Sequence, residues 1–361
     1  MPRIKADVLA DFVRDIFIAT GCSPEESARI GQYLVGSNLA GHDSHGVARV
    51  PRYVKWKQDG VFFADREVKA VVDTPVLAVL DGQRGFGQTT APQAVRIGID
   101  KCKAMGLSAV ALRNSGHVGR VGEWAEMAAQ AGLVSIHFVN VIGSVLVAPF
   151  GGVDRRFSTA PFCVGIPRKD QGPVILDFAT SLVAEGKVLV ASQGGKKLPP
   201  DALVTQDGQM SGDPHVLYGD FKPDGPRDYK QGTGAIRAFG EHKGSGLALM
   251  CELVGGALSG NGASAFDRQW SQGMFSFYVD PGKIDPEHFF PGEVTRALDF
   301  VKGSKPLTPG GEVLVPGEPE ARNRAERLNN GVPLPDDTWA AIVETARSVG
   351  LDERRIQQAT M

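Results

Sequence analysis

The chain has 361 residues, of which 42% are hydrophobic and 22% charged, and its formal net charge is −2. This balance is typical of a globular protein with one large core or two domains. The mixed charges argue against a basic nucleic-acid-binding protein, and no apolar run reaches the roughly 18 residues of a membrane span. The N-terminus does not read as a signal peptide, and four scattered cysteines favour a reduced, cytoplasmic protein.

The first sixty residues predict a helical unit. Apolar residues spaced along 7–20 predict a first helix, and Ser23-Pro24-Glu25-Glu26, a capping box with proline in the first turn, predicts a second that ends near Ala40. A short helix through Tyr53 is expected to end near Gly60. The polar segment His42-Asp43-Ser44-His45-Gly46 lies between these helices.

The rest of the chain predicts an α/β fold, with helical ends around a central sheet. Strands are expected at 68–72, 76–80, 107–112, 134–139, 162–166 and 174–178, and helices at 90–104, 122–131, 180–191, 244–258 and 337–349. Residues 195–235 are rich in Gly, Pro and Asp, and this composition predicts extended loop.

The usual dinucleotide-binding fingerprint is missing. A Rossmann site needs G-x-G-x-x-G directly after a strand and at the start of a helix. The nearest match, Gly260-Asn261-Gly262-Ala263-Ser264-Ala265, follows a predicted helix and is typical of a turn. The glycines in 116–122 follow a strand, but their spacing is wrong. Motifs alone therefore do not predict a nicotinamide cofactor.

The segment from His42 to Gly46 allows three interpretations. Its two histidines beside an acid could ligate a metal, the segment could cap a helix, or its donors could bind an anion or cofactor. Arg49 and Tyr53 lie four and eight residues beyond His45 and would share a helical face with it. There Arg49 could hold a carboxylate through its guanidinium fork, or it could be a solvated surface charge.

The segment Asn114-Ser115-Gly116-His117-Val118-Gly119 places a histidine in a polar loop at the end of a predicted strand. Such loops often carry the chemistry of α/β proteins, and an ordinary pKa of ~6.5 lets histidine exchange protons near neutrality. The alternative is a histidine that only hydrogen-bonds within a turn.

Two further segments offer helix starts that could bind an anion. In Asp177-Phe178-Ala179-Thr180-Ser181, the Asp or the Thr could cap the following helix. The segment Glu241-His242-Lys243-Gly244-Ser245-Gly246 opens a strongly apolar helix. Simple capping is the alternative for both segments. Pro316-Gly317-Glu318 predicts a turn.

Together these segments are far more specific than any one of them. With them the sequence resembles the type-2 malate/L-lactate dehydrogenase family over nearly its full length, and it looks closest to the hydroxycarboxylate dehydrogenase B branch. The segments, in chain order, are Asn38-Leu39-Ala40-Gly41-His42-Asp43-Ser44-His45-Gly46, Asn114-Ser115-x-His117-x-Gly119, Ala148-Pro149-Phe150-Gly151, Asp177-x-Ala179-Thr180-Ser181, His242-Lys243-Gly244 and Pro316-Gly317-Glu318.

This resemblance implies a non-Rossmann α/β fold in which a largely antiparallel central sheet binds the cofactor. An N-terminal helical segment, 1–70, is expected to pack with the C-terminal segment 325–361 as a second domain. Residues 71–324 are expected to form the sheet-containing cofactor-binding domain, with a helical insert near 240–262. The resemblance also implies a homodimer, and a cofactor that is NAD, with NADP as the alternative.

Site residues carry over from the family position by position. His117 is expected to donate and accept the proton, and Arg49 to bind the substrate carboxylate. Ser44 and Tyr53 match substrate-side positions, and His45 is expected at the nicotinamide end of the cofactor. The other cofactor-lining positions are Gly119, Arg120, Val121, Ile175, Leu176, Asp177, Phe178, Ala179, His242, Gln272, Pro316, Gly317 and Glu318. No metal ligand is expected.

The implied activity is hydride transfer between a nicotinamide cofactor and a small 2-hydroxy or 2-oxo acid of the malate, lactate or hydroxycarboxylate type. Within the same family, the alternative is NADPH-dependent reduction of cyclic imine carboxylates such as Δ1-piperideine-2-carboxylate. Two other classes stay open. One is a metallohydrolase that uses His42, Asp43, His45 and His117, and the other is a relative that binds its ligand without turnover.

Overall fold

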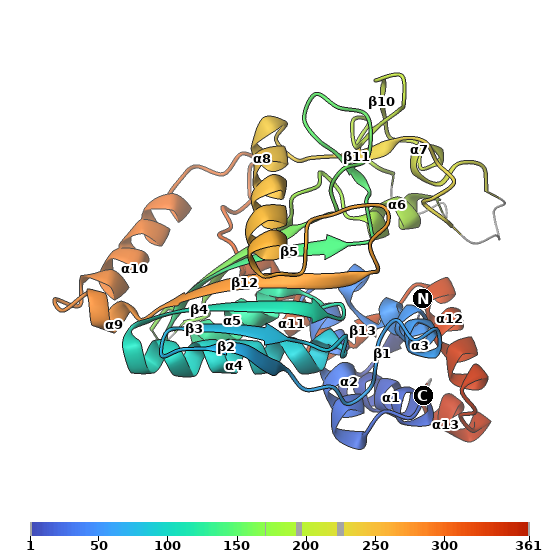
Figure 1. The fold of residues 1–361 in the computed structure, drawn as a ribbon. Coiled ribbons are helices and arrows are strands. Elements are labelled where there is room, and N and C mark those ends of the chain that lie inside the picture. The colour runs from blue at the N-terminus through green and yellow to red at the C-terminus, as the bar shows by residue number, and fades with distance from the viewer. Residues whose placement is uncertain (1, 170, 193–196, 222–226, 360–361) are drawn as a thin grey trace.

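A seven-stranded sheet forms the centre of the computed structural model, which describes residues 2–169, 171–192, 197–221 and 227–359 (Figure 1). Among these described strands, β3 and β4 are parallel, and the other five neighbouring pairs are antiparallel. A mixed α/β fold with a multistranded sheet is thus confirmed. In spatial order the strands are β2 (Lys69–Asp73), β3 (Leu77–Asp81), β4 (Leu107–Ser115), β12 (Ser271–Val279), β5 (Val134–Ile142), β7 (Pro161–Ile166) and β8 (Val174–Ala179).

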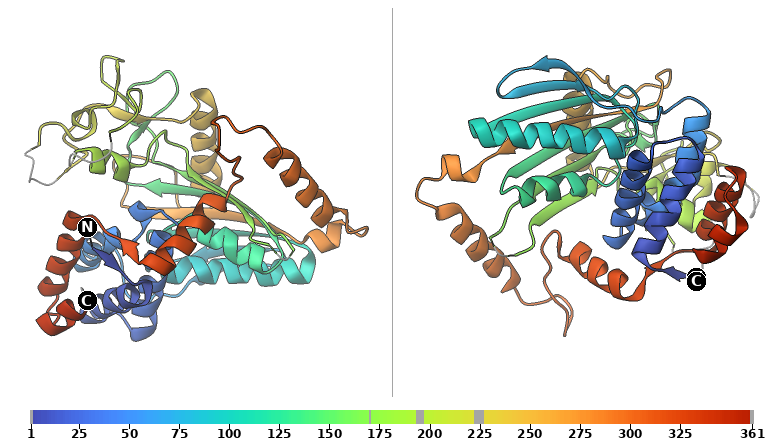
Figure 2. Two further views of the ribbon diagram at one scale, coloured as in Figure 1. Left: turned by 180° about the vertical axis from the view of Figure 1, so that it is seen from behind. Right: turned by 90° about the horizontal axis from the view of Figure 1, so that it is seen from below.

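Helices cover both faces of this sheet. Helices α4 (Gly87–Met105) and α5 (Val121–Gln130) lie on one face, and α8 (His242–Met250) continues into the π-helix η3 (Cys251–Leu258) on the other (Figures 1 and 2). Trp124 of α5 is buried in a hydrophobic cluster with Leu112 of β4 and Met274 of β12. The sheet is therefore buried against α4 and α5, and this packing fixes the loop that leaves β4.

The helices near the two ends of the chain share one hydrophobic cluster, which contains Phe12, Tyr53 and Ile342. Ser23 Oγ accepts a hydrogen bond from the Glu26 amide at 3.2 Å, as the capping box predicts. The strands β1 (Arg3–Ile4) and β13 (Val332–Pro333) pair antiparallel. The helices are α1 (Ala6–Ala19), α2 (Pro24–Leu39), α3 (Val50–Gln58), α12 (Asp336–Ser348) and α13 (Glu353–Gln358), with short 3-10 turns η1 (Asp43–His45) and η2 (Val47–Arg49).

The stretch predicted as extended loop, 195–235, is more structured than expected in its described part. Leu203, Leu217 and Tyr218 are buried in a third hydrophobic cluster. Elements of two to four residues are too short to show a periodic pattern, so composition misled the prediction. The elements within this stretch are β9 (Leu203–Val204), β10 (Met210–Ser211), α7 (His215–Tyr218) and the start of β11 (Ala235–Arg237). The three strands form a four-stranded sheet with β6 (Val147–Ala148), and α6 (Glu185–Ser192) precedes the stretch.

The predicted helix at 180–191 starts later than expected. Helix α6 begins at Glu185, because Ser181 is still extended and forms a β-bridge with Ala238. Of the predicted loop 195–235, residues 195–196 and 222–226 lie outside the described residues.

Several C-terminal elements have no counterpart in the sequence prediction. Strand β12 is central and mostly buried on both faces, so it lacks the alternation of a half-buried strand. Helix α10 (Phe289–Lys302) has no buried residue and extends away from the sheet (Figure 2). Helix α11 (Glu318–Asn330) is largely polar, and α9 (Pro281–Ile284) is a single turn.

No helix in the described ranges is long and apolar enough to cross a membrane.

Candidate active site

His117 lies buried in the loop between β4 and α5, and neighbouring elements hold that loop from two sides. The side-chain Oε1 of Gln272, in β12, accepts a hydrogen bond from the Val118 amide at 2.7 Å. At the start of α4, a Cβ on Gly87 would lie only 2.1 Å from the carbonyl oxygen of His117. Glycine is therefore required there, and packing fixes the position of the histidine.

Tyr53 and Gln88 complete a hydrogen-bonded chain with His117. The hydroxyl of Tyr53, in α3, is 2.5 Å from Nδ1 of His117. Nε2 of Gln88, in α4, donates to the Tyr53 hydroxyl oxygen at 3.1 Å and to the His117 carbonyl oxygen at 3.3 Å. All three side chains are buried. Two of the predicted site residues, His117 and Tyr53, are thus brought into direct contact.

His45 and Arg49 lie beside these hydrogen-bonded side chains. The rings of His45 and His117 are stacked, with centroids 5.5 Å apart and planes 17° apart. Nε of Arg49 donates to the carbonyl oxygen of Ser44 at 2.6 Å, and Ser44 Oγ is 3.1 Å from Nδ1 of His45. The Nη atoms of Arg49 have no hydrogen bond or ion pair in the described part of the chain. The free end of a guanidinium is thus available to a carboxylate.

His117, Tyr53, His45 and Arg49 form one group of side chains, the His117 cluster. Burial keeps its members uncharged, with the exception of Arg49. Burial, with Arg49 and His45 nearby, holds the pKa of His117 well below its ordinary value. Burial, Arg49 and His42 together lower the pKa of His45 to about 3. Burial raises the pKa of Tyr53, although Arg49 opposes that shift. At neutral pH His117 is therefore a neutral imidazole, the form that accepts a proton.

Candidate cofactor residues from β8, α5 and η1 converge close by. The Asp177 carboxyl accepts a hydrogen bond from the Gly122 amide at 2.7 Å. Burial raises the pKa of Asp177, while His42, the Gly122 bond and Arg120 lower it. The expectation that Asp177 or Thr180 caps the next helix is wrong. Asp177 lies within β8, beside the start of α5, and Thr180 Oγ1 donates to the carbonyl oxygens of Thr159 and Ala160.

Arg120 provides a test of whether these residues fit a phosphate-bearing cofactor. Its side chain is 1% exposed, and Nη2 is bound to Glu126 at 2.6 Å and to Glu123 at 3.1 Å. Burial opposes its charge, but these two carboxylates outweigh that effect and raise its pKa. Nε and Nη1 are buried without a hydrogen-bond partner among the described residues. Unpaired cationic donors beside the start of a helix fit an anionic group.

The turn at Pro316 lies against β8, although the two are far apart in sequence. The Ile175 amide donates to the carbonyl oxygen of Pro316 at 3.2 Å, and Gly317 has a φ of +96°. Glu318 begins α11, accepts a hydrogen bond from the Val315 amide at 3.0 Å and pairs with Lys302. The predicted Pro316–Glu318 turn and part of the predicted β8 segment therefore meet.

The other predicted cofactor positions are placed as follows. Leu176 is exposed on β8, Phe178 packs against Phe162 and Phe239, and Ala179 pairs with Pro161. Gly119 has a φ of +72°, and Val121 is the buried first residue of α5. His242 is the exception. It begins α8, its ring is 5.9 Å from that of Phe150, and in the described chain it has no hydrogen bond, ion pair or ring contact with the His117 cluster.

His42 and Asp43 do not form a metal site with His45. Asp43 accepts hydrogen bonds from Arg327 at 2.6 Å and from Asn38 at 2.7 Å, and His42 is 3.3 Å from Glu320. Both residues thus face α11 instead of sharing one centre. In the described ranges, no group of three His, Cys, Asp or Glu side chains is placed to hold a metal ion. The metallohydrolase alternative therefore lacks a ligand set there.

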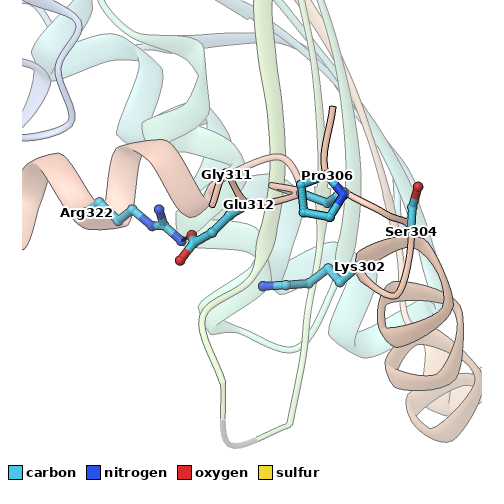
Figure 3. Close-up of a pocket in the computed structure, with 7 residues that line it drawn as sticks. Lys302, Ser304, Pro306, Gly311, Glu312 and Arg322 are labelled. Atoms are coloured by element: carbon cyan, nitrogen blue, oxygen red, sulfur yellow. Dashed lines mark hydrogen bonds and ion pairs between the residues drawn. The ribbon is translucent and has the colours of Figure 1, made fainter. Parts of the chain in front are cut away.

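A surface cavity of about 340 Å³ lies between the end of α10 and the start of α11 (Figure 3). Its lining includes Lys302, Glu312 and Arg322, and Arg322 and Glu312 form an ion pair. None of the predicted site residues lines it, although Lys302 also pairs with Glu318.

Comparison with known proteins decides the family. The family model for malate/L-lactate dehydrogenase matches residues 4–343. The chain belongs to this malate/L-lactate dehydrogenase family. The resemblance inferred from the ordered motifs is confirmed, and so is the enzyme class that it predicted, an oxidoreductase of hydroxy acids.

Relatives of this dehydrogenase match it over at least nine tenths of its length. Hydroxycarboxylate dehydrogenase B of Escherichia coli strain K12 is 40% identical, over 98% of this chain and 96% of its own. The Δ1-pyrroline-2-carboxylate/Δ1-piperideine-2-carboxylate reductase of Pseudomonas syringae pv. tomato is 30% identical, over 90% of each. Among solved structures, the malate dehydrogenase of Pyrococcus horikoshii OT3 superimposes with a TM-score of 0.84 at 26% identity, covering 97% of this chain and 96% of its own.

Sequence reasoning missed two residues that contact the predicted site of this dehydrogenase. Gln88 binds Tyr53 and the His117 backbone, and the Trp270 ring lies 6.3 Å from the His117 ring. Neither residue belongs to a recognisable motif. Only the packing of α4 and of the segment before β12 against the His117 loop brings them there, so no local signal could have identified them.

Proposed function

We propose that this protein is a nicotinamide-dependent dehydrogenase of small 2-hydroxy acids, with His117 as its acid–base group. The observation that carries the proposal is the contact of a buried, neutral His117 with Tyr53, next to the unpaired end of Arg49. A proton acceptor beside a carboxylate-binding cation is what oxidation of a 2-hydroxy acid needs.

His117 removes the hydroxyl proton of a 2-hydroxy acid and, when protonated, returns it to the oxygen of a 2-oxo acid. Tyr53 occupies Nδ1, so Nε2 is the nitrogen left for the substrate oxygen. The Arg49 guanidinium binds the substrate carboxylate through its Nη atoms while Ser44 holds its Nε. Binding of the carboxylate in this way orients C2 of the substrate relative to His117.

We propose that the cofactor binds beside this cluster, along β8 and the start of α5, without a Rossmann crevice. Its nicotinamide accepts or supplies the hydride. His45 lines the nicotinamide end through its position on His117. Gly119, Arg120 and Val121, together with β8 and the Pro316–Glu318 turn, line the remainder, and the unpaired Arg120 atoms bind its phosphates. Gln272 and His242 belong to this set by family resemblance. We propose NAD as the cofactor, with NADP as the alternative.

We further propose that the enzyme is a cytoplasmic homodimer, with residues 1–70 and 325–361 forming its second domain. The exposed apolar side chains of α10, a helix with no buried residue, support a partner surface. Phe300 and Phe289 of α10 and Leu258 of η3 are all more than 60% exposed. Light scattering of the purified protein should give twice the chain mass, and a monomer at micromolar concentration would contradict the dimer.

The test of the proposed function is a panel of 2-oxo acids offered with NADH and with NADPH, followed at the nicotinamide absorbance. At least one small 2-oxo acid should be reduced, and the rates with the two cofactors fix their order of preference. If every acid fails with both cofactors although the cofactor binds, the proposed activity is wrong and a ligand-binding protein remains.

A second candidate function is reduction of cyclic imine carboxylates. It is favoured by the 30% identity to the Pseudomonas syringae pv. tomato reductase over 90% of both chains. The same Arg49 and His117 would bind the carboxylate and protonate the imine nitrogen. Side-by-side assays of Δ1-piperideine-2-carboxylate and pyruvate separate the two, because the true substrate should have the higher kcat/KM.

A further inference from the structure

Gln88 joins the backbone and the side-chain partner of His117 through one amide group. The residue lies near the start of α4 and is 1% exposed. Its Nε2 atom is 3.1 Å from the Tyr53 hydroxyl oxygen and 3.3 Å from the carbonyl oxygen of His117. No motif or family residue named above includes it.

The orientation of this amide follows from its two partners. A backbone carbonyl oxygen only accepts hydrogen bonds, so the Gln88 atom that faces the His117 carbonyl must be the nitrogen. Turning the amide over would place Oε1 against that carbonyl oxygen and leave two acceptors in contact. Nε2 therefore also donates to the Tyr53 oxygen.

The direction of the Tyr53 hydroxyl hydrogen in turn determines which ring nitrogen of His117 carries a hydrogen. Because the Tyr53 oxygen accepts from Gln88, its own hydrogen points to the remaining partner, Nδ1 of His117, at 2.5 Å. A ring nitrogen that accepts a hydrogen bond carries no hydrogen of its own. In a neutral imidazole the single ring hydrogen must then be on the other nitrogen.

We propose that Gln88 is a positioning residue that, acting through Tyr53, places the ring hydrogen of neutral His117 on Nε2. The inference rests on the proposed function, in which Nε2 meets the substrate oxygen. The resting enzyme then presents an N–H, suited to the carbonyl oxygen of a 2-oxo acid. A 2-hydroxy acid can lose its proton to Nε2 only after the ring hydrogen has moved to Nδ1.

Gln88 also opposes protonation of His117. In the imidazolium form Nδ1 carries a hydrogen and must donate to the Tyr53 oxygen, so the Tyr53 hydrogen loses its acceptor. The titratable groups that face His117 act in the same direction: Arg49 from η2, His45 from η1 and Arg52 from α3. Trp270 and Gln88 face it from the other packed segments and carry no charge.

Nitrogen-15 NMR of the histidine rings tests this assignment without any need for activity. The purified full chain is labelled at histidine nitrogens, and the His117 signals are assigned by their loss in His117→Asn. The wild-type protein at pH 7.5 should show an N–H signal for Nε2 and a bare-nitrogen signal for Nδ1. A wild-type spectrum with the hydrogen on Nδ1 would overturn the inference.

Two variants separate the positioning role from folding. Gln88→Met removes both amide donors without adding charge, and Gln88→Glu offers an acceptor to the Tyr53 hydroxyl. In Gln88→Glu the ring hydrogen should move to Nδ1, and in Gln88→Met both forms should appear. Gln93→Glu is the matched control, because Gln93 also lies in α4 but accepts from the Val68 amide at 2.9 Å. It should leave the His117 signals unchanged.

The pH profile of kcat/KM for hydroxy-acid oxidation provides a second readout. Its acid limb reports the pKa of His117 and should rise by about one pH unit in Gln88→Met, since the protonated ring regains a free acceptor. Gln93→Glu should keep the wild-type profile. If folded Gln88→Met keeps the wild-type nitrogen signals of His117 and the wild-type pH profile of kcat/KM, the positioning role is overturned. Normal turnover in His117→Asn, with the nitrogen shifts as expected, would instead overturn the proposed function alone.

Discussion

The imidazole rings of His45 and His117 are stacked with their centroids 5.5 Å apart. The two histidines come from different segments, η1 and the loop after β4, and His45 adds to burial and Arg49 in holding the pKa of His117 below its ordinary value. This pair joins the substrate-side residues to the proposed nicotinamide end of the cofactor.

Acid should destabilise the fold through its buried histidines. Burial holds the pKa of His117 well below its ordinary value and lowers those of His45 and His137 to about 3. The unfolded chain, with pKa values near 6.5, therefore binds protons first as the pH falls. Stability is retained above pH 6.5 and is lost below it, by roughly 1.4 kcal/mol per histidine at pH 5.5.

Urea unfolding at pH 7.5 and at pH 5.5 measures this loss. His137→Asn should reduce the difference between the two pH values, because one buried histidine is gone. His288→Asn is the control, since His288 is exposed and has the positive φ that asparagine tolerates. An identical pH dependence in wild type and His137→Asn would contradict the argument.

Arg49→Lys should weaken substrate binding more than turnover. A lysine ammonium is a point charge and cannot bind a carboxylate through two parallel bonds. The loss of one charge-assisted hydrogen bond corresponds to an increase in KM on the order of 10- to 100-fold. Steady-state kinetics with varied 2-oxo acid measure this, with Arg347→Lys on the exposed side of α12 as control. A KM within twofold of wild type would rule out Arg49 as the carboxylate ligand.

Gly122→Ala should impair cofactor binding. A Cβ at this position would lie 2.5 Å from Nη1 of Arg120 and 3.0 Å from the Asp177 carboxyl, so both must shift. Displacement of this kind costs about 1–3 kcal/mol, which corresponds to roughly a 5- to 150-fold loss of affinity. Fluorescence titration with NADH measures it. Gly246→Ala in α8, where a Cβ meets nothing within 4 Å, should bind normally, and equal affinities for the two variants would contradict the proposed phosphate site.

The cysteine thiols should not react in the folded protein. All four are free and buried, and burial raises the pKa of Cys22 and Cys251 to about 12 and that of Cys102 to about 11. Since the thiolate is the reactive form, Ellman's reagent should detect almost no thiol before denaturant is added and four afterwards. Rapid labelling of the native protein would contradict this burial.

The sequence predicted the elements whose side chains have a strong period. The α1 helix is an example, whereas β4 was predicted from the short apolar run 107–112 that leads into a polar loop. Strand β12 was missed, since a central strand covered on both faces lacks alternation, and α10 was missed because it has no buried face at all. The two-residue strands around Leu203 depend on tertiary contacts and were equally invisible.

The candidate site shows the same division. His117 could be singled out because it lies in an ordered family motif, and Arg49 because it matches a family position, and the structure places both beside Tyr53. Gln88 could not, because its role arises from the approach of α4 to the His117 loop. Asp177 was misjudged as a helix cap, since sequence order hides the fact that β8 lies beside α5.

The central claim is that His117 transfers the proton, and kcat of His117→Asn tests it most directly. The variant is assayed with the best 2-oxo acid from the panel at saturating cofactor, beside His288→Asn as the control. General acid–base catalysis predicts a fall in kcat of roughly 10²–10⁴-fold, with NADH affinity and the unfolding midpoint near wild type. A folded His117→Asn enzyme with kcat within a few-fold of wild type would contradict the account.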